Sequence, residues 1–461
     1  MRRTLPSYLF ILCLATAAAG CSGRGTSAPV PQAGGQVGTA ASERASAGLA
    51  ELSRRQIDAH IQHVVIVFQE NRSMNNLFNG YPGATTTTTA PVSTGGTINL
   101  QPVPLEAKTA GAEHFLSDFL AACNGKGSFP GTDCQMNGFD LEQGQKDAAF
   151  DYVPQTETVP LWSIANQFVL DDNMFQSQVD SSFTAHQYII ASADGSATNI
   201  PTSTWGCGGT SAVPTITPQR TMGPTESPCF DYQTLADEIN ATPGMSWRFY
   251  SGSNSTPGGD AYSSFRAIHH IRYSKYWHHN IVAPASNFLT DVPAGKLATV
   301  TWITPSWTNS DHPGSHSNTG PSWVASIVNA IGQSKFWNST MIFVTWDDWG
   351  GFYDPVAPTM IDYDGPGFRV PLLCVSPYAY QGRVRKGGSM HDFDSIVRFV
   401  EWRWNLPSLT QRDAKADPAD DGCTNTQQTT PRPFQPIPSK YSREFFLQQS
   451  PYGPPPDDDG Y

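Results

Sequence analysis

The sequence predicts an α/β fold in which a mostly parallel central sheet is layered with helices and interrupted by long loop excursions. Four short apolar runs, rich in β-branched and aromatic residues, are typical of buried strands: "HVVIVF", "ATVTWITP", "MIFVTW" and "VPLLCVS". Three segments have apolar residues at helical spacing: "SSFTAHQYIIASA", "SWVASIVNAIGQS" and "DSIVRFVEWRW". Strands interleaved with helices favour a parallel sheet. The Gly-, Pro- and Thr-rich stretches 79–111, 194–230 and 252–261 are expected to be surface excursions.

Size and charge limit the class of protein. The chain has 461 residues, of which 39% are hydrophobic and 15% are charged, so it is long enough for one large domain or two smaller ones. Its net charge of −12 disfavours binding to the phosphate backbone of nucleic acids. We therefore expect no nucleic-acid partner.

The N-terminus predicts export. A basic "MRRT" precedes the apolar "LPSYLFILCLATAAAG", which is typical of a signal peptide over residues 1–21. Ala18-Ala19-Gly20-Cys21 resembles a bacterial lipobox, which would attach a lipid anchor to Cys21. Because Ala18 stands where leucine is usual, ordinary cleavage is the alternative. The expected location is periplasmic or anchored at the outer membrane, with secretion as the alternative.

The mature chain divides into three parts by composition. Residues 22–57 are poor in apolar side chains and predict a flexible linker. Residues 58–448 contain all the predicted strands and helices and form the expected catalytic domain. Residues 449–461 end in "PPPDDDGY" and predict an acidic, proline-rich tail.

Six cysteines follow Cys21, and in an exported chain they predict disulfides. Short loop closure favours Cys123–Cys134 and Cys207–Cys229. Cys374 lies inside an apolar run, so we expect a buried free thiol there, and its pairing with Cys423 stays open.

Acidic side chains follow the predicted strands where each strand ends. Glu70 and Asn71 follow the first strand, and Asp347 and Asp348 follow "MIFVTW". Ligands of open α/β sheets bind beyond the carboxyl ends of strands. Buried carboxylates repel one another unless a cation lies between them, and hard divalent cations prefer oxygen ligands. We therefore predict one divalent cation, with Ca²⁺, Mg²⁺, Mn²⁺ or another metal left open. The alternative is that these acids cap a helix or face water.

Ser182 stands where a helix is expected to begin, and His186 follows one turn later on the same face. A helix N-terminus stabilises an alkoxide or a phosphate group, so Ser182 is a candidate nucleophile. The common alternative is that Ser181 or Ser182 caps the helix. Four further histidines are candidates for proton transfer or phosphate binding: His114, His269, His270 and His312.

Six ordered segments resemble the bacterial phosphoesterase family, which contains the non-haemolytic phospholipases C and an acid phosphatase. They are "HVVIVFQENRSMNNLFNGYPGA", "SSFTAHQYIIA", "SDHPGS…GPSWVASIVNAI", "MIFVTWDDWGGFYDPVAP", "GPGFRVPLLCVSPYA" and "HDFDSIVRFVEWRWNLPSL", from about residue 61 to 408. The resemblance implies an alkaline-phosphatase-like core, one metal ion and a Ser or Thr nucleophile.

Carried over by position, the resemblance assigns roles to individual residues. It implies metal ligands at Glu70, Asn71, Ser182, Asp347 and Asp348. Ser182 matches the nucleophile of the family's "(S/T)F-x-x-H" segment, and His312, His270 and His114 match catalytic histidines. Asn71, His186 and His269 are expected to contact the substrate.

The sequence departs from the family pattern at several positions. Met74-Asn75 replaces Phe-Asp, and Pro355 stands where the family often has histidine. "HDFDS" and the pair Asp347-Asp348 are nearer the acid-phosphatase-like members than the phospholipases.

The predicted function is metal-dependent hydrolysis of phosphate esters through a phosphoserine, in the manner of an acid phosphatase. One alternative is a phospholipase C that cleaves phospholipid headgroup diesters. An alternative of another class is a non-catalytic binding lipoprotein on the cell surface. Sulfate-ester hydrolysis is disfavoured, because Ser182 is not in the "(C/S)xPxR" setting of sulfatases.

Overall fold

The structure is a computed structural model that describes residues 55–56, 58–108, 111–145, 147–252 and 262–450. These residues belong to one structural unit, residues 50–461. The predicted signal peptide with Cys21, nearly all of the linker and tail, and residues 253–261 lie outside the described residues. Among the described helices, none combines the length and the apolar character needed to cross a membrane.

The central sheet has eight strands in the order β10-β9-β11-β1-β12-β13-β6-β14. The predicted strands are confirmed as β1, β11, β12 and β13, and the sequence analysis did not single out the other four. The bounds are β1 (His63–Gln69), β6 (Val169–Asp171), β9 (Trp247–Tyr250), β10 (Ile281–Val282), β11 (Val300–Ile303), β12 (Thr340–Trp346), β13 (Leu372–Val375) and β14 (Arg383–Arg385).

The expected parallel pairing is confirmed for the middle of the sheet. β1 pairs in parallel with both β11 and β12, with Val64 opposite Val300 and Met341. β12 is buried at every residue, as expected for a strand covered on both faces. β13 departs from the expectation, because it runs antiparallel to both β12 and β6. The predicted α/β class with a mostly parallel sheet is therefore confirmed, with one strand reversed.

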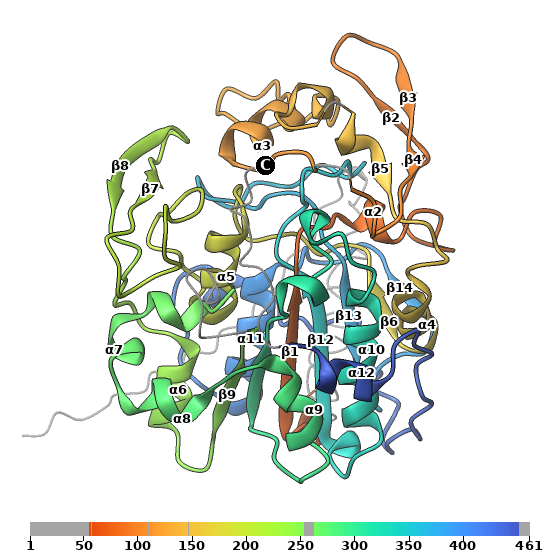
Figure 1. Cartoon of the computed structure of the whole chain (residues 1–461), viewed down its shortest axis with the longest axis vertical. Coiled ribbons are helices and arrows are strands. Elements are labelled where there is room, and N and C mark those ends of the chain that lie inside the picture. Colours follow the sequence, from red (N-terminus) through yellow and green to blue (C-terminus); the bar gives the residue numbers. More distant parts are fainter. Residues whose placement is uncertain (1–54, 57, 109–110, 146, 253–261, 451–461) are drawn as a thin grey trace, which may run out of the picture. The chain divides into compact units, whose positions relative to one another are not determined.

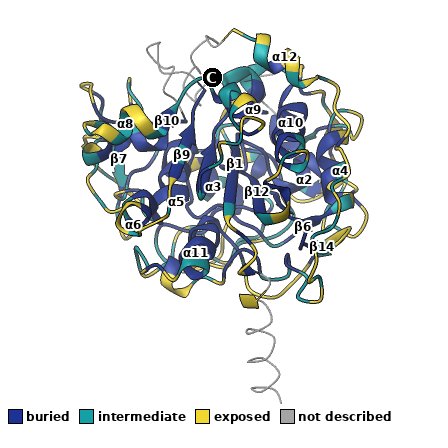
Figure 2. Cartoon of the chain, turned by 90° about the horizontal axis from the view of Figure 1, so that it is seen from below, coloured by how far each residue is buried: buried dark blue, intermediate teal, exposed yellow. Residues whose placement is uncertain are grey.

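Helices cover both faces of the sheet. Figure 2 shows α4, α9 and α10 on one side and α5, α6 and α11 on the other. The three predicted helices are confirmed as α5, α10 and α11. The bounds are α2 (Met74–Leu77), α3 (Leu116–Cys123), α4 (Val159–Gln167), α5 (Ser182–Ala191), α6 (Leu235–Ala241), α7 (His269–Arg272), α8 (Lys275–Asn280), α9 (Phe288–Asp291), α10 (Gly320–Gly332), α11 (Phe393–Trp404) and α12 (Arg443–Gln448).

A cap, formed by the described residues 84–152, lies above the carboxyl edge of the sheet in Figure 1. It contains α3 and two small sheets, β2 (Thr89–Pro91) with β3 (Thr97–Asn99) and β4 (Gln101–Pro102) with β5 (Asp151–Tyr152). Its own hydrophobic cluster includes Phe119, Phe139 and Phe150 and reaches Trp349 and Phe368 beyond the cap. The predicted excursion 79–111 is thus the first part of a larger packed structure.

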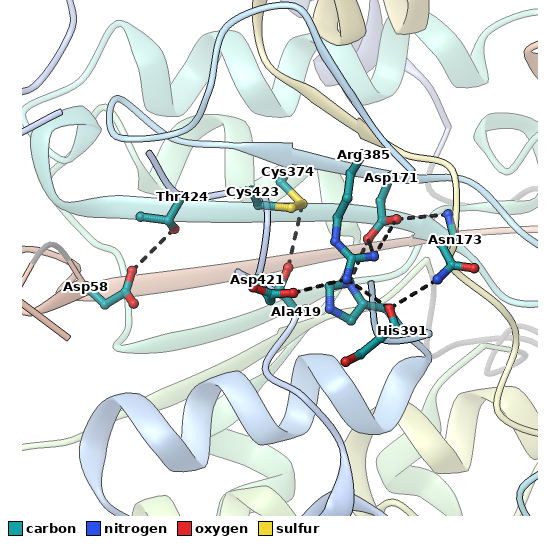
Figure 3. The surroundings of a disulfide bond; sticks show 11 residues. Asp58, Asp171, Asn173, Cys374, Arg385, His391, Ala419, Asp421, Cys423 and Thr424 are labelled. Carbon is teal, nitrogen blue, oxygen red and sulfur yellow. Dashed lines mark hydrogen bonds and ion pairs between the residues drawn. A yellow bond between two sulfur atoms is a disulfide. The ribbon is translucent and has the colours of Figure 1, made fainter. Parts of the chain in front are cut away.

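The described residues contain three disulfides. Cys123–Cys134 closes a loop in the cap, and Cys207–Cys229 closes the segment that contains β7 (Val213–Ile216) and β8 (Met222–Glu226), as predicted. Cys374 is not a free thiol, because it is bonded to Cys423. Figure 3 shows this bond near a buried ion-pair network in which Asp171 lies between Arg385 and His391. Asp171 Oδ2 is 2.6 Å from His391 Nδ1, and Asp171 Oδ1 is 3.1 Å from an Arg385 nitrogen.

A buried carboxyl group on α11, Glu401, makes the stability of the fold depend on pH. Glu401 is fully buried, and burial, together with Asp413 beside it, raises the pKa of Glu401 to about 9. The unfolded chain releases this proton near pH 4.3, so the folded state binds more protons between about pH 4.3 and pH 9. The free energy of unfolding therefore falls as the pH rises through this window, by up to about 1.4 kcal/mol per pH unit for one group.

We predict that Glu401→Gln flattens this slope between pH 5 and pH 8, because glutamine has a similar size and does not ionise. Urea unfolding at a series of pH values measures it, with the exposed Glu106→Gln as the matched control. An unchanged slope in Glu401→Gln would show that this carboxyl does not control the loss of stability between pH 5 and pH 8.

Candidate active site

The carboxyl edge of the sheet brings three chain segments together, as the sequence predicted. Glu70 follows β1, and its N–H donates to the carbonyl of Ser310, in the segment that follows β11, at 2.9 Å. Asp347 follows β12, and its N–H donates to the carbonyl of Gln69 at 2.9 Å. Because β11, β1 and β12 are adjacent and parallel, the residues that follow them converge. Glu70, Asp347 and Asp348 are all fully buried.

Asn71 links these segments to one another. Its backbone is left-handed, with φ of 51°, and its N–H donates to Asp347 Oδ1 at 2.6 Å. Its side-chain nitrogen lies 3.2 Å from Ser182 Oγ and 3.2 Å from Asp348 Oδ2. The backbone of Asn71 can lie this close to the turn after Asp348 only because residue 350 is glycine. A Cβ at Gly350 would lie 2.2 Å from the carbonyl oxygen of Asn71. The glycine turn after the two aspartates therefore lets Asn71 face the candidate nucleophile.

Ser182 is the first residue of α5 and is fully buried. Its hydroxyl donates to Asp348 Oδ2 at 3.1 Å. Asp348 also accepts the N–H of Gly350 at 2.7 Å, which holds the carboxylate in place. Ser181, and not Ser182, is the N-cap residue, and its side chain makes no capping hydrogen bond. The helix N-terminus contributes positive potential at the Ser182 hydroxyl. The arrangement therefore suits a serine that loses its proton and attacks an electrophile.

His186 lies one turn along α5, and its Nε2 is 2.9 Å from Glu70 Oε1. Its ring is stacked on Tyr262 and meets Phe68 edge-on, so its position is fixed by packing. Glu70, His186 and Asp347 each offer a ligand atom, and these three atoms lie within 4.8 Å of one another. The sequence assigned His186 to the substrate, whereas the structure places it among the candidate cation ligands.

The donor set fits a divalent cation. Two carboxylates and an imidazole are common ligands of Zn²⁺ and of other first-row metals, and carboxylate-rich sets also accept Mn²⁺ or Mg²⁺. Asn71 Oδ1 is buried and has no hydrogen-bond partner among the described residues, so it offers a further oxygen. Asp348 and Ser182 were also predicted as cation ligands. In the structure the Ser182 hydroxyl donates a hydrogen bond to Asp348, next to the group formed by Glu70, His186 and Asp347.

His114 reaches the site from the cap. Its Nε2 is 2.7 Å from the side-chain nitrogen of Asn71 and 3.6 Å from Asp348 Oδ2. Its ring packs edge-on against Trp349, whose side chain belongs to the hydrophobic cluster of the cap. Packing of the cap therefore positions this histidine, and His114 and Ser182 share the partners Asn71 and Asp348.

His312 is buried in the segment that follows β11. Its Nδ1 accepts the N–H of Gly314 at 3.0 Å, so the proton of the neutral ring resides on Nε2. Its ring centroid is 4.3 Å from that of Trp307. The preceding residue, Asp311, is held by Gln69 and by Trp346, and burial raises the pKa of Asp311 to about 6.

The structure does not bring His270 and His269 to this cluster. Both ring nitrogens of His270 face carboxylates, Asp231 at 2.7 Å and Asp237 at 3.0 Å, and its side chain is 35% exposed. His269 is exposed and packs against Tyr273. No contact among the described residues joins either histidine to Ser182. Their expected catalytic and substrate-binding roles therefore gain no support from the geometry.

Gln176 is a positioning residue that the sequence analysis missed. Its Oε1 accepts the N–H of Trp349 at 3.0 Å, and its Nε2 donates to the carbonyls of Gln178 and Asp180. It therefore ties the segment before Ser182 to the segment after Asp348. The segment "DNMFQSQVDSS" contains two buried glutamines, Gln176 and Gln178, and nothing in the sequence singles out Gln176 for this role.

A comparison with protein families explains why these segments occur together in one chain. The model of the phosphoesterase family matches residues 61–407, which include every member of the buried cluster. The chain belongs to the phosphoesterase family. The resemblance noted in the sequence is thereby confirmed over most of the chain.

Relatives of this phosphoesterase-family chain include plant and bacterial phospholipases C. Non-specific phospholipase C6 of Arabidopsis thaliana is 33% identical over 32% of this chain and 34% of its own length. Non-specific phospholipase C1 of the same plant is 25% identical over 62% of this chain and 54% of its own. The non-hemolytic phospholipase C of Burkholderia pseudomallei is 30% identical over 25% and 20%. The chain thus spans about half, or less, of the curated relatives it matches.

Solved structures that resemble this member of the phosphoesterase family have low sequence identity. A sulfatase from a Pseudoalteromonas species matches 86% of this chain and 77% of its own at 10% identity, with a TM-score of 0.39. A protein of the alkaline phosphatase superfamily from Vibrio parahaemolyticus matches 78% and 71% at 9% identity, with a TM-score of 0.35. At these scores we draw nothing from the similarity about the site.

Proposed function

We propose that this chain is a phosphoesterase that hydrolyses phosphate esters with Ser182 as its nucleophile. The observation that carries the proposal is the buried hydroxyl of Ser182, which donates to Asp348 and faces the amide of Asn71 at the start of α5. Membership of the phosphoesterase family supports the reaction class. A serine that merely capped the helix would not need a carboxylate as its hydrogen-bond acceptor.

In the first step, Ser182 Oγ attacks phosphorus while the bond to the leaving oxygen breaks. The hydroxyl proton passes to Asp348, which already accepts it at 3.1 Å. The amide of Asn71 and the N-terminus of α5 stabilise negative charge on Oγ and on the phosphoryl oxygens. His114, beside Asn71 and Asp348, lies where it can contact the same oxygens. In the second step, water attacks the phosphoserine, and Ser182 leaves with a proton.

A divalent cation would be held by Glu70, His186 and Asp347, with Asn71 Oδ1 as a further donor. Bound there, it would supply Lewis-acid polarisation of the phosphate and offset the charge of the buried carboxylates. This assignment keeps the predicted single cation and replaces Asp348 and Ser182 by His186 among the ligands.

His312 is proposed to assist the departing oxygen through its Nε2–H. Because Nδ1 accepts a backbone N–H, the ring proton is on Nε2, from which it can be donated to the departing oxygen. The developing alkoxide is stabilised by this bond, and the benefit grows as the leaving alcohol becomes less acidic.

We predict that His312→Ala lowers kcat/KM about tenfold or less for p-nitrophenyl phosphate and by about 10²–10³-fold for an alkyl phosphate. Nitrophenolate leaves without help, whereas an alkoxide needs a donor. Rates across a series of leaving groups measure the difference as the slope against leaving-group pKa. Parallel slopes for the two proteins would contradict the role of His312.

Phospholipid diesters are the first proposed substrate class, because curated relatives are named phospholipases C. Phosphate monoesters are the second, since "HDFDS" and the pair Asp347-Asp348 resemble the acid-phosphatase-like members. Export and a lipid anchor at Cys21 stay part of the proposal as sequence predictions. A non-catalytic binding protein would not need Ser182, Asn71 and Asp348 in mutual contact.

The test is a substrate panel with the purified protein in the presence of divalent cations. Hydrolysis of p-nitrophenylphosphorylcholine and of phosphatidylcholine above that of p-nitrophenyl phosphate supports the phospholipase C class, and the reverse order supports a phosphatase. If no ester in the panel is hydrolysed with Mn²⁺, Zn²⁺, Ca²⁺ or Mg²⁺, the proposed function is wrong.

A further inference from the structure

We propose that Asp311 is a positioning residue that holds His312 against the two strand ends next to the candidate cation ligands. Asp311 directly precedes His312 in the segment that follows β11, and its side chain is 1% exposed. A buried carboxylate is costly unless donors or cations compensate for it, so its contacts indicate what it holds together. The proposal deepens the proposed function, on which it rests, by naming the residue that places the proton donor.

The carboxylate of Asp311 links the ends of two neighbouring strands. Its Oδ2 accepts hydrogen bonds from Gln69 Nε2 and from Trp346 Nε1, both at 3.3 Å. Gln69 is the last residue of β1 and directly precedes Glu70, and Trp346 is the last residue of β12 and directly precedes Asp347. One carboxylate oxygen therefore contacts the residue before each of the two proposed carboxylate ligands.

The backbone of Asp311 is tied to the segment after β1 as well. Its carbonyl accepts a hydrogen bond from Arg72 Nε at 2.7 Å, and the carbonyl of the preceding Ser310 accepts the N–H of Glu70 at 2.9 Å. Arg72 is buried, and its guanidinium lies 4.9 Å from the Phe352 ring. Because Arg72 lies two residues after Glu70, the contacts to Asp311 come from both sides of this candidate ligand.

Asp311 has a left-handed backbone, with φ of 74°, which residues other than glycine adopt rarely. Such a conformation persists where surrounding contacts fix it, and residues of this kind are concentrated at functional sites. The backbone angles of Asp311 set the direction of the chain at His312. The contacts that hold Asp311 therefore also hold the position of His312.

The other carboxylate oxygen, Oδ1, lies against the start of α10. A Cβ at Gly320, the first residue of α10, would lie 1.9 Å from Asp311 Oδ1. This oxygen is buried and has no hydrogen-bond partner among the described residues. The positive potential of the helix N-terminus and the charge of Arg72 offset part of the carboxylate charge. Glycine at position 320 therefore permits the carboxylate to lie here, and a side chain would displace it.

A positioning role and a general structural role predict different dependence on the leaving group. A variant that only weakens the fold loses the same fraction of its rate with every ester. A variant that displaces His312 loses most with esters whose leaving alcohol needs a proton donor. The ratio of kcat/KM between a nitrophenyl ester and an alkyl ester, of the ester class that the protein hydrolyses, separates the two roles.

The test variant is Asp311→Gly, because glycine removes the carboxylate and adopts the left-handed backbone without strain. Gly320→Ala is a second variant, which keeps the carboxylate and displaces it. The matched control is Asp133→Gly, since Asp133 is an exposed aspartate with a left-handed backbone, φ of 53°, in a loop of the cap. Asp311→Gly is also combined with His312→Ala.

We expect Asp311→Gly and Gly320→Ala to lower kcat/KM about tenfold or more for the alkyl ester and about threefold or less for the nitrophenyl ester. Asp133→Gly should match wild type. In the His312→Ala background, Asp311→Gly should have no further effect, because both changes remove the same interaction. Equal losses for the two esters, or an undiminished effect in the His312→Ala background, would overturn the proposal.

Chemical modification of His312 gives a readout that needs no substrate. Diethylpyrocarbonate reacts with exposed imidazoles, and peptide mass spectrometry measures the rate at each histidine. The rate at His312 should rise at least about fivefold in Asp311→Gly and stay unchanged in Asp133→Gly, with the buried His391 as internal reference. An unchanged rate in Asp311→Gly contradicts the proposal. If wild type hydrolyses no ester, the proposed function is wrong, and this rate still decides whether Asp311 holds His312.

Discussion

Replacing Ser182 by alanine is expected to lower phosphoester turnover by about 10³-fold or more, with little change in stability. The substitution removes only the hydroxyl group. Asp348 keeps the N–H of Gly350 and the amide of Asn71 as hydrogen-bond donors. The fold around the site therefore persists while the attacking oxygen is lost. Steady-state kinetics on p-nitrophenylphosphorylcholine and on p-nitrophenyl phosphate measure the effect.

Ser181→Ala is the matched control. The two serines are adjacent and both fully buried, but the Ser181 side chain makes no capping hydrogen bond to α5. We expect Ser181→Ala to keep its rate within about threefold of wild type, since its hydroxyl does not contact Asp348. Trapping a phosphoenzyme with a slow substrate adds a second readout, because the label should be absent only from Ser182→Ala. An active Ser182→Ala, or a labelled one, would place the nucleophile elsewhere.

The centre of the fold was predictable because it depends on local patterns. β1 and β12 are continuous apolar runs, and only strands covered on both faces combine that composition with that length. Their ends could be identified from the abrupt change to Gln69-Glu70-Asn71 and Asp347-Asp348. The rule that ligands bind beyond the carboxyl ends of parallel strands then predicted that these residues lie close together. Ser182 and His186 followed from helical spacing.

The direction of each strand and the pairing of the cysteines were not predictable, because both depend on residues that are distant in the sequence. The apolar run of β13 is compatible with either direction, and its antiparallel pairing with β12 has no local signal. Cys374 and Cys423 are 49 residues apart, too far for loop closure to favour their pairing. The packing of the cap depends on aromatic contacts such as Phe119 with Phe368, which no periodicity indicates.

The histidines show the same limit at the level of single residues. His114, His270 and His312 were assigned by resemblance, and nothing in their local sequences distinguishes them. The difference lies in their partners: Asp231 and Asp237 hold His270, whereas Asn71 and Asp348 face His114. His186 lies beside Glu70 because of the rotation of α5 about its axis relative to β1. Helical spacing in a sequence predicts this rotation only approximately.

Replacing Asp347 by asparagine is expected to remove the proposed cation and, with it, most of the activity. Asp347 Oδ1 already accepts the N–H of Asn71 at 2.6 Å, so Oδ2 is the oxygen that we expect to face the cation. In asparagine that position would become an NH₂ group, which donates hydrogen bonds and does not bind metals. Elemental analysis after exhaustive dialysis should give about one divalent ion per wild-type chain and none for Asp347→Asn.

Thermal unfolding gives a second readout that needs no substrate. A ligand at about 1,000 times its Kd stabilises the folded state by about 4 kcal/mol, so wild type should gain stability with the cation. Asp347→Asn should gain none, because the site loses one of its two carboxylate ligands and keeps only Glu70. The exposed Asp417→Asn, which removes the same charge elsewhere, should respond like wild type. If Asp347→Asn is stabilised as strongly as wild type, the cation is held by other residues.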